Sequence, residues 1–268
     1  MRNSRPFAIG IDLGGTRLKA VAVAHDGQVL NRTRPRTHGS CGMLKPCVTA
    51  IWDTIARIET QQGRRASHVG LATPGVIDRS SRWVAWCPGK LAGIERFDWT
   101  VALNRKDPVP LLNDAHAALV AEHWVGAAAE FHYAILLTLG TGVGGAVLNE
   151  GRLLRGANGW AGALGFLSLG PFGPKSFFTV PGALEDWIGN QTVSERSRGR
   201  FQDTRQLVAA ARAGNLEAKK IWRKSVRALA VAIASFAMIF DMEAAIIGGG
   251  IARLANSSLS RLPTNWTT

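Results

Sequence analysis

The amino-acid sequence predicts an α/β protein of two similar lobes with a cleft between them. Short apolar runs accompany a stretch of helical periodicity early in the chain, which is typical of α/β domains. Three glycine-rich turns each follow an apolar run. The pattern of residues 8–30 returns in residues 134–154, about 126 positions later, so we infer one internal duplication rather than a short repeat.

The composition is that of a globular protein with an unusually basic balance. Of the 268 residues, 46% are hydrophobic and 19% are charged. The formal net charge of +13 would suit a nucleic-acid or membrane partner. The basic residues are scattered, however, and no basic region leads into leucine heptads, so we expect neither partner. The apolar run 228–240 would span about 20 Å as a helix, short of the roughly 30 Å bilayer core, which predicts a buried helix.

Cysteine use and the N-terminal residues indicate the compartment. Cys41, Cys47 and Cys87 form no CxxC pair, which argues against a disulfide framework and against a cysteine zinc site. Residues 1–10 lack an apolar signal core, so the sequence predicts a cytoplasmic protein.

The first lobe is expected over residues 1–114. Asp26-Gly27 is a strong hairpin signal between two alternating stretches, and the spacing of apolar residues over 44–58 predicts a helix. The expected strands cover residues 8–12, 18–24, 28–33, 69–74 and 109–114.

The second lobe is expected over residues 115–268 and repeats the strand–turn–strand order within 134–154. Glu150-Gly151 stands where the first lobe has Asp26-Gly27. We expect helices over 204–213 and from Asn215 towards Phe240, and then a strand over 243–247.

Two kinds of residue suggest chemistry. Glycine lets successive backbone N–H groups approach an anion, so the turns at 13–16, 140–145 and 248–250 predict phosphate-binding sites. Residues 140–145 also match GxGxxG, but no helix follows them, which excludes a Rossmann dinucleotide site. Where an apolar run meets a helix-like stretch, Asn113 is followed by Asp114, which is either a helix cap or a catalytic carboxylate.

The stretches IGIDLGGT, LLNDAHAA, LTLGTGVGGAVLNEG, AGALGFLSL and AAIIGGGIA, in that order, resemble the ROK family of glucokinase-type sugar kinases and related repressors. The resemblance runs from Phe7 to about Arg253 and implies the actin-like ATPase (ribonuclease H-like) fold. It also implies ATP-dependent phosphorylation of a sugar or sugar-like hydroxyl in carbohydrate metabolism, with ATP and Mg²⁺ as cofactors. A homodimer is a further implication, because dimers are common in the family.

By the same resemblance, Asp114 is the general base, and Asn113 and Asp114 bind the sugar together with Glu185 and the turn Pro74, Gly75, Val76. Such a carboxylate can accept the proton of a sugar hydroxyl as it attacks the γ-phosphorus. Asp12 is expected near the Mg²⁺-bound phosphates. The implied nucleotide- and phosphate-binding residues are Asp12, Gly14, Gly15, Thr16, Lys19, Thr138, Gly140, Thr141, Gly142, Gly144, Gly248, Gly249 and Gly250.

The chain departs from the family pattern at its sugar and zinc positions. The family reads AGE-x-GH at residues 161–166, so Ala163 replaces a sugar-binding glutamate and Phe166 a histidine that binds sugar and zinc. Residues 170–185 lack the cysteines of the family's zinc loop, and no structural zinc is expected. Each lost hydrogen bond is worth ~0.5–1.5 kcal/mol, which predicts weaker hexose binding or a less hydroxylated acceptor. Only 18 residues follow Gly250, so the second lobe is expected to be shortened at its C-terminus.

Three functions fit these residues. A sugar kinase uses the base and both phosphate turns, whereas a non-catalytic sugar or nucleotide sensor would explain Ala163 and Phe166. A DNA-binding repressor is disfavoured, because the first strand begins at residue 7 and leaves no preceding helix-turn-helix domain. Trp83, Trp86 and Trp99 could line a sugar pocket, and His116 and His123 are expected on a helix surface.

Overall fold

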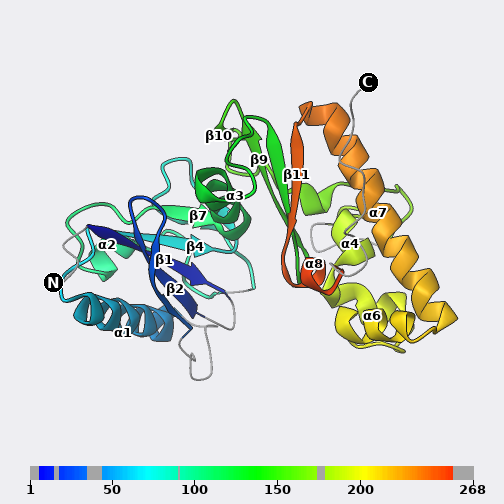
Figure 1. The fold of residues 1–268 in the computed structure, drawn as a ribbon, viewed down its shortest axis with the longest axis horizontal. Helices are drawn as coiled ribbons and strands as arrows, with labels where there is room; N and C mark the ends of the chain where they lie inside the picture. The colour runs from blue at the N-terminus through cyan, green and yellow to red at the C-terminus, as the bar shows by residue number, and fades with distance from the viewer. Residues whose placement is uncertain (1–5, 15–17, 35–43, 90, 174–178, 256–268) are drawn as a thin grey trace. The chain divides into compact units, whose positions relative to one another are not determined.

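The structure is a computed structural model that describes residues 6–14, 18–34, 44–89, 91–173 and 179–255 (Figure 1). The chain forms two compact units, each a sheet with helices, as the α/β prediction requires. The first unit contains the residues up to 125 together with 155–161, and the second contains the remaining described residues. The lobe boundary after residue 114 stays a prediction. The division into compact units is a different one, and it assigns the helix that begins at Asp114 to the first unit.

A five-stranded sheet of order β3-β2-β1-β4-β7 forms the centre of the first unit. β1, β4 and β7 run parallel, whereas β2 is antiparallel to both β1 and β3. Alternation along β1 buries every second side chain, because successive residues of a strand point to opposite faces. The strands are β1 (Phe7–Leu13), β2 (Leu18–Ala24), β3 (Val29–Thr33), β4 (His68–Thr73) and β7 (Leu111–Asn113).

Helix α1 (Leu44–Gln62) lies along β1 and β2 (Figure 1) and confirms the predicted helical period. Its buried face, which includes Ile51 and Ile55, shares one core with the strands. Helix α3 (Asp114–Val125) contacts β7 and β4. Three elements of this unit were not predicted: β5 (Val76–Ile77), β6 (Val84–Trp86) and α2 (Trp99–Ala102). Trp99 is 1% exposed and belongs to the core, so it lines no sugar pocket.

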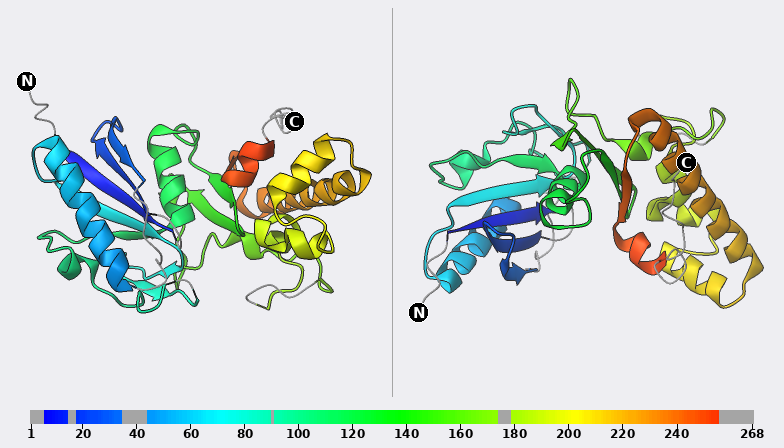
Figure 2. Two further views of the ribbon diagram at one scale, coloured as in Figure 1. Left: turned by 90° about the horizontal axis from the view of Figure 1, so that it is seen from below. Right: turned by 45° about the horizontal axis from the view of Figure 1, so that its top comes forward.

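The second unit is built on a four-stranded sheet of order β10-β9-β8-β11, in which β8 and β11 run parallel. Both views of Figure 2 show α6 beside α7. The strands are β8 (Ala134–Leu139), β9 (Val143–Asn149), β10 (Arg152–Leu153) and β11 (Ala244–Gly248). The helices are η1 (Leu164–Phe166), α4 (Leu184–Ile188), η2 (Asn190–Thr192), α5 (Val193–Arg196), α6 (Thr204–Arg212), α7 (Leu216–Phe240) and α8 (Gly250–Ala255).

The long helix α7 contains the apolar run 228–240 in its second half. It begins after Asn215, whose side-chain oxygen accepts a hydrogen bond from the Ala218 amide at 2.9 Å, as an N-cap residue does. Leu229 and Phe236 pack in the core of the unit, as expected of a buried helix. The prediction holds for one face only, because Val231, Met238 and Ile239 are 48%, 85% and 62% exposed. Over the residues that the structure describes, no helix has both the length and the apolar character needed to cross a membrane.

The two sheets confirm the internal duplication. The strand order β3-β2-β1-β4 matches β10-β9-β8-β11, with the same parallel and antiparallel directions. Gly27 and Gly151 occupy the equivalent hairpin turns with φ of 84° and 71°, a conformation that glycine adopts without steric cost. β7, which carries Asn113, has no counterpart among the described strands of the second unit.

Candidate functional site

The first unit gathers its candidate residues at one edge of the sheet. β1, β4 and β7 are adjacent and parallel, so their carboxyl ends meet there. Asp12 pairs with Ala72, and Ala72 pairs with Leu112, the residue before Asn113. At about 4.8 Å between neighbouring strands, the backbones of Asp12 and Leu112 lie roughly 10 Å apart.

Asn113 and Asp114 mark the point where β7 becomes α3. The Asn113 side chain donates to the carbonyl of Gly75 at 3.1 Å and accepts from the amide of Ala115 at 3.0 Å. The Asp114 carboxylate accepts from that same amide at 2.9 Å, and its side chain is exposed. Asp114 therefore contributes to capping, but Asn113 shares the task. The carboxylate is not limited to this one bond, since each oxygen of a carboxylate accepts more than one hydrogen bond.

Asp12 and Lys19 face each other across the first hairpin. They are paired in register, and the Lys19 ammonium nitrogen is 2.6 Å from the Asp12 carboxylate. Their side chains are 36% and 55% exposed, so the ion pair contributes little to stability. Both side chains are therefore able to rearrange around a charged ligand. Gly14 follows β1, while Gly15 and Thr16 lie outside the described residues.

The turn Pro74, Gly75, Val76 follows β4 and lies next to β7. Gly75 has φ of 102°, and a Cβ added there would lie 2.6 Å from the carbonyl oxygen of Trp86. Only glycine fits this approach, which lets the Gly75 carbonyl meet the Asn113 amide. The structure thus brings the candidate sugar turn and Asn113 into direct contact.

His116 was expected on a helix surface, and this expectation was wrong. The residue is only 5% exposed, and its Nε2 lies 3.0 Å from the carbonyl oxygen of Ala161. A carbonyl only accepts, so Nε2 carries the proton. Burial, with the nearby charge of Arg155, lowers the pKa of His116, while the Ala161 bond raises it in part. Sequence reasoning missed this contact because its partner is 45 residues away.

The second unit brings its two glycine-rich segments together. Gly248 pairs with Thr138 in the parallel ladder of β11 and β8, so both strands end at one edge of the sheet. Gly249 has φ of 95°, and a Cβ there would collide with the carbonyl of Leu139. The backbone amides of Thr141 and Gly142 donate to no described residue. Such a pair of amides at a turn suits an anion.

Glu185 lies beneath this turn rather than at a surface. Glu185 is 7% exposed, and one of its carboxylate oxygens is 3.4 Å from the amide nitrogen of Val143. A Cβ on Gly142 would collide with that oxygen. Glu185 therefore supports the second glycine turn, a contact that the sequence did not reveal. Gly144 follows within β9.

Arg196 holds the segment 189–192, which contacts the glycine turn at Thr141. It donates to the hydroxyls of Thr192 and Ser225 at 3.0 and 2.7 Å and to the carbonyl of Gly189 at 3.0 Å. Burial lowers the pKa of Arg196 to about 10. The amide of Gln191 in turn donates to the carbonyl of Thr141 at 3.0 Å. The guanidinium thus links α7 and α5 to the backbone that carries the turn.

Ala163 and Phe166, the two departures from the family pattern, flank and end η1. This segment packs backbone to backbone on β9, since a Cβ on Gly145 would lie 2.5 Å from the carbonyl of Gly162, and one on Gly165 would collide with that of Val143. The side chains at these two positions are a methyl group and a phenyl ring, and the comparison with a family glutamate and histidine stays a prediction. Among the described residues, no three metal-binding side chains cluster, and 174–178 of the former zinc loop are not described.

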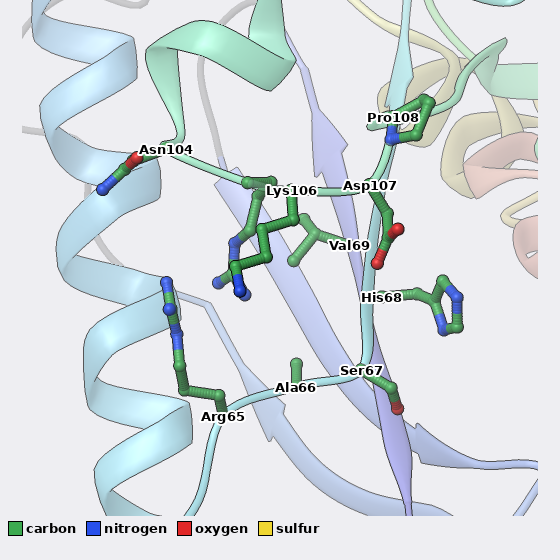
Figure 3. A pocket seen from close by; sticks show the side chains of 10 residues that line it. Arg65, Ala66, Ser67, His68, Val69, Asn104, Lys106, Asp107 and Pro108 are labelled. Carbon is green, nitrogen blue, oxygen red and sulfur yellow. The ribbon is translucent and has the colours of Figure 1, made fainter.

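A small pocket of about 150 Å³ lies elsewhere in the first unit (Figure 3). Arg65, His68, Lys106 and Asp107 are among its lining residues. It adjoins the start of β4, whereas Asn113 pairs with Thr73 at the end of β4. The pocket is therefore at the opposite end of the sheet from the candidate residues and has no part in the site.

Comparisons with known proteins show the family of this chain. The model of the ROK family matches residues 8–265. A glucokinase of Thermotoga maritima is 33% identical over 269 aligned positions, which cover 91% of this chain and 82% of the relative. An N-acetylmannosamine kinase of Escherichia coli O139:H28 is 29% identical, covering 96% of this chain and 87% of the relative.

Solved structures share the fold. A ROK hexokinase from Thermus thermophilus superposes with a TM-score of 0.80 at 31% identity, covering 92% of this chain and 83% of that one. A ROK family glucokinase from Streptomyces griseus, in complex with glucose and AMPPNP, gives a TM-score of 0.76 at 25% identity, with 92% and 84% covered. The fold class expected from the sequence, two similar lobes of the actin-like ATPase type, is confirmed.

Proposed function

This chain belongs to the ROK family, and on that premise we propose that it is an ATP-dependent kinase that phosphorylates a hydroxyl group of a sugar or sugar-like acceptor. The two similar relatives are a glucokinase and an N-acetylmannosamine kinase, and they support this reaction class. The glucose and AMPPNP held by the Streptomyces griseus glucokinase support the pairing of a sugar with a nucleotide.

The observation that carries the proposal is the exposed carboxylate of Asp114 beside Asn113 at the carboxyl edge of three parallel strands. A sugar hydroxyl is a poor nucleophile, and Asp114 accepts its proton as the oxygen attacks the γ-phosphorus. The amide of Asn113 is fixed by Gly75 and Ala115, so the residue beside the base is held in one orientation. Pro74, Gly75 and Val76 contact the acceptor next to Asn113.

The phosphate chain is held by the glycine turns. Amides of Thr141 and Gly142 donate to phosphate oxygens, together with the turns at Gly14 and Gly248–Gly250. Mg²⁺ is commonly held by one or two carboxylates with phosphate oxygens, and the partly exposed carboxylate of Asp12 suits it. When bound, Mg²⁺ neutralises charge on the phosphates. The ammonium group of Lys19, which lies 2.6 Å from the Asp12 carboxylate, pairs with the negative charge of the phosphates.

The protein groups proposed to bind the acceptor differ from those that would bind a plain hexose. Ala163 and Phe166 offer no hydrogen bonds from their side chains, so hydroxyls read by a glutamate and a histidine elsewhere in the family are not read here. Glu185 stays in the proposed sugar site, where it also supports the turn at Gly142. We therefore propose an acceptor with fewer hydroxyl contacts than glucose.

A nucleotide-consumption assay over a panel of hexoses, amino sugars and cyclitols tests the proposal. Asp114→Asn keeps the shape of the side chain and removes the base, so kcat is expected to fall by about 10²–10⁴-fold. Asp107→Asn is the matched control, because this exposed aspartate adjoins the opposite end of the sheet. Equal turnover by Asp114→Asn and the unmodified protein would remove Asp114 from the mechanism.

The replacement of two sugar ligands by Ala163 and Phe166 favours one alternative, a sensor that binds sugar without phosphorylating it. Calorimetry on the same panel separates the two. Sugar binding without turnover on any acceptor is the result expected of the sensor.

A further inference from the structure

Two tryptophans that are far apart in the sequence meet on the first unit. The ring centroids of Trp86 and Trp160 are 5.3 Å apart and the rings are inclined at 46°, within the range of favourable aromatic pairs. Trp86 ends β6, and Trp160 lies in the segment 155–161, which returns to this unit from the second. Despite their size they are 37% and 42% exposed. The pair thus presents aromatic surface to solvent in the first unit, and such surface is common in ligand sites.

Trp160 is held next to the helix of Asp114. Its neighbour Ala161 accepts the hydrogen bond of the buried His116, two residues after Asp114. On the other side, Gly159 has φ of 79° and approaches the carbonyl of Ile77 so closely that a Cβ would collide with it. Trp160 is therefore fixed between the first turn of α3 and the hairpin of β5 and β6.

Trp86 is held next to Asn113 by an independent route. It pairs with Val76 in the same small hairpin, and its carbonyl lies against Gly75. The carbonyl of Gly75 accepts the Asn113 side chain at 3.1 Å. Two separate tethers therefore hold the backbone that carries the aromatic pair near the turn of Gly75 and the first turn of α3, the two elements that carry the residues of the proposed function.

We propose that Trp86 and Trp160 form an apolar recognition site for the phosphoryl acceptor, and that the acceptor is a pyranose with an apolar substituent, such as the methyl of an N-acetyl group or an aglycone. This inference rests on the proposed kinase function and names its substrate class. An aromatic ring packs against the apolar face of such a ligand, while the half-buried Asn113 and the exposed Asp114 bind its hydroxyls.

Direct binding of N-acetylmannosamine, phenyl β-glucoside and glucose, measured by calorimetry without nucleotide, tests the site. Trp86→Ala and Trp160→Ala are each expected to raise Kd for the first two ligands by about 10-fold, with a smaller change for glucose. Trp160→Phe retains an aromatic face and should stay within about twofold of the unmodified protein. Trp124→Ala is the control, because Trp124 is 49% exposed near the far end of the same helix α3.

Several outcomes are decisive. Unchanged Kd in both alanine variants, or no binding of any of the three ligands by the unmodified protein, overturns the inference. Where an acceptor is phosphorylated, KM should rise in the alanine variants while kcat stays within about twofold, because the rings touch the ligand away from the reacting oxygen. Tryptophan-dependent binding without phosphorylation of any acceptor would refute the kinase and leave the recognition site standing.

Discussion

The buried His116 should make the stability of the first unit depend on pH. Burial lowers its pKa in the folded protein, whereas the unfolded chain retains a value of about 6.5. Between these two values the unfolded state binds more protons, so the free energy of unfolding rises with pH. Stability is therefore complete above about pH 6.5 and declines as the pH falls towards the folded pKa, by ~1.4 kcal/mol for each unit of difference.

Two substitutions separate the charge from the contact. His116→Gln keeps an N–H donor for the Ala161 carbonyl and cannot titrate, so we expect a loss below about 1.5 kcal/mol at pH 8 and a weaker pH dependence. His116→Ala removes the donor to the Ala161 carbonyl and leaves a cavity in place of an imidazole ring whose residue is only 5% exposed. An unpaired buried acceptor costs about 1–3 kcal/mol, and with the lost packing we expect about 2–4 kcal/mol.

Urea unfolding followed by tryptophan fluorescence at pH 5, 6, 7 and 8 measures these quantities, with the exposed His68→Gln as control. The control should keep the pH dependence of the unmodified protein. If His116→Gln also keeps the full dependence, another group titrates and the reasoning about His116 is wrong.

Two further predictions concern the second unit. Gly165→Ala should destabilise the protein by about 2–4 kcal/mol in urea unfolding, because its Cβ would meet the backbone of Val143, whose carbonyl carbon is 2.9 Å from that position. Gly140→Ala, where nothing lies within 4 Å, should cost less than about 1 kcal/mol, and equal losses would contradict this account. Arg196→Lys keeps the charge but not the planar fork that serves Thr192, Ser225 and Gly189, so we expect a loss of about 1–3 kcal/mol and weaker binding of AMPPNP. Arg205→Lys, at an exposed position on α6, should change neither quantity, and an Arg196→Lys variant that matches it would rule out the proposed support of the turn.

Local patterns predicted most of the regular structure. Alternation and hairpin signals gave the strands of both sheets, because a strand that is buried on one face must alternate and Asp-Gly turns favour tight hairpins. The strand expected over 109–114 was shorter, since β7 covers only Leu111–Asn113 and Asp114 already starts α3. The hairpin of β5 and β6 escaped prediction because two strands of two and three residues leave no readable period.

The sequence predicted those parts of the candidate site whose residues lie together in one short motif. The glycines after β8 and β11 were identified because glycine lets successive backbone N–H groups approach an anion. Asn113-Asp114 stood out where an apolar run meets a helix-like stretch, and the resemblance to the ROK family supplied the expected role of each residue. The roles of these residues stay predictions. Glu185 was expected to face the sugar, and its support of the glycine turn depends on a contact across 42 residues that no pattern encodes.

The sequence by itself determined the α/β class, the duplicated strand order and the family, because periodicity, turn chemistry and ordered motifs are properties of neighbouring residues. Only the tertiary structure decided that His116 is buried, that residues 155–161 return to the first unit and that Trp86 meets Trp160. These contacts join segments more than 40 residues apart, as in the bond of His116 to Ala161, and they depend on how the segment 155–161 packs on the first unit. Packing of this kind is settled by the shape and burial of whole elements, which residue spacing alone does not specify.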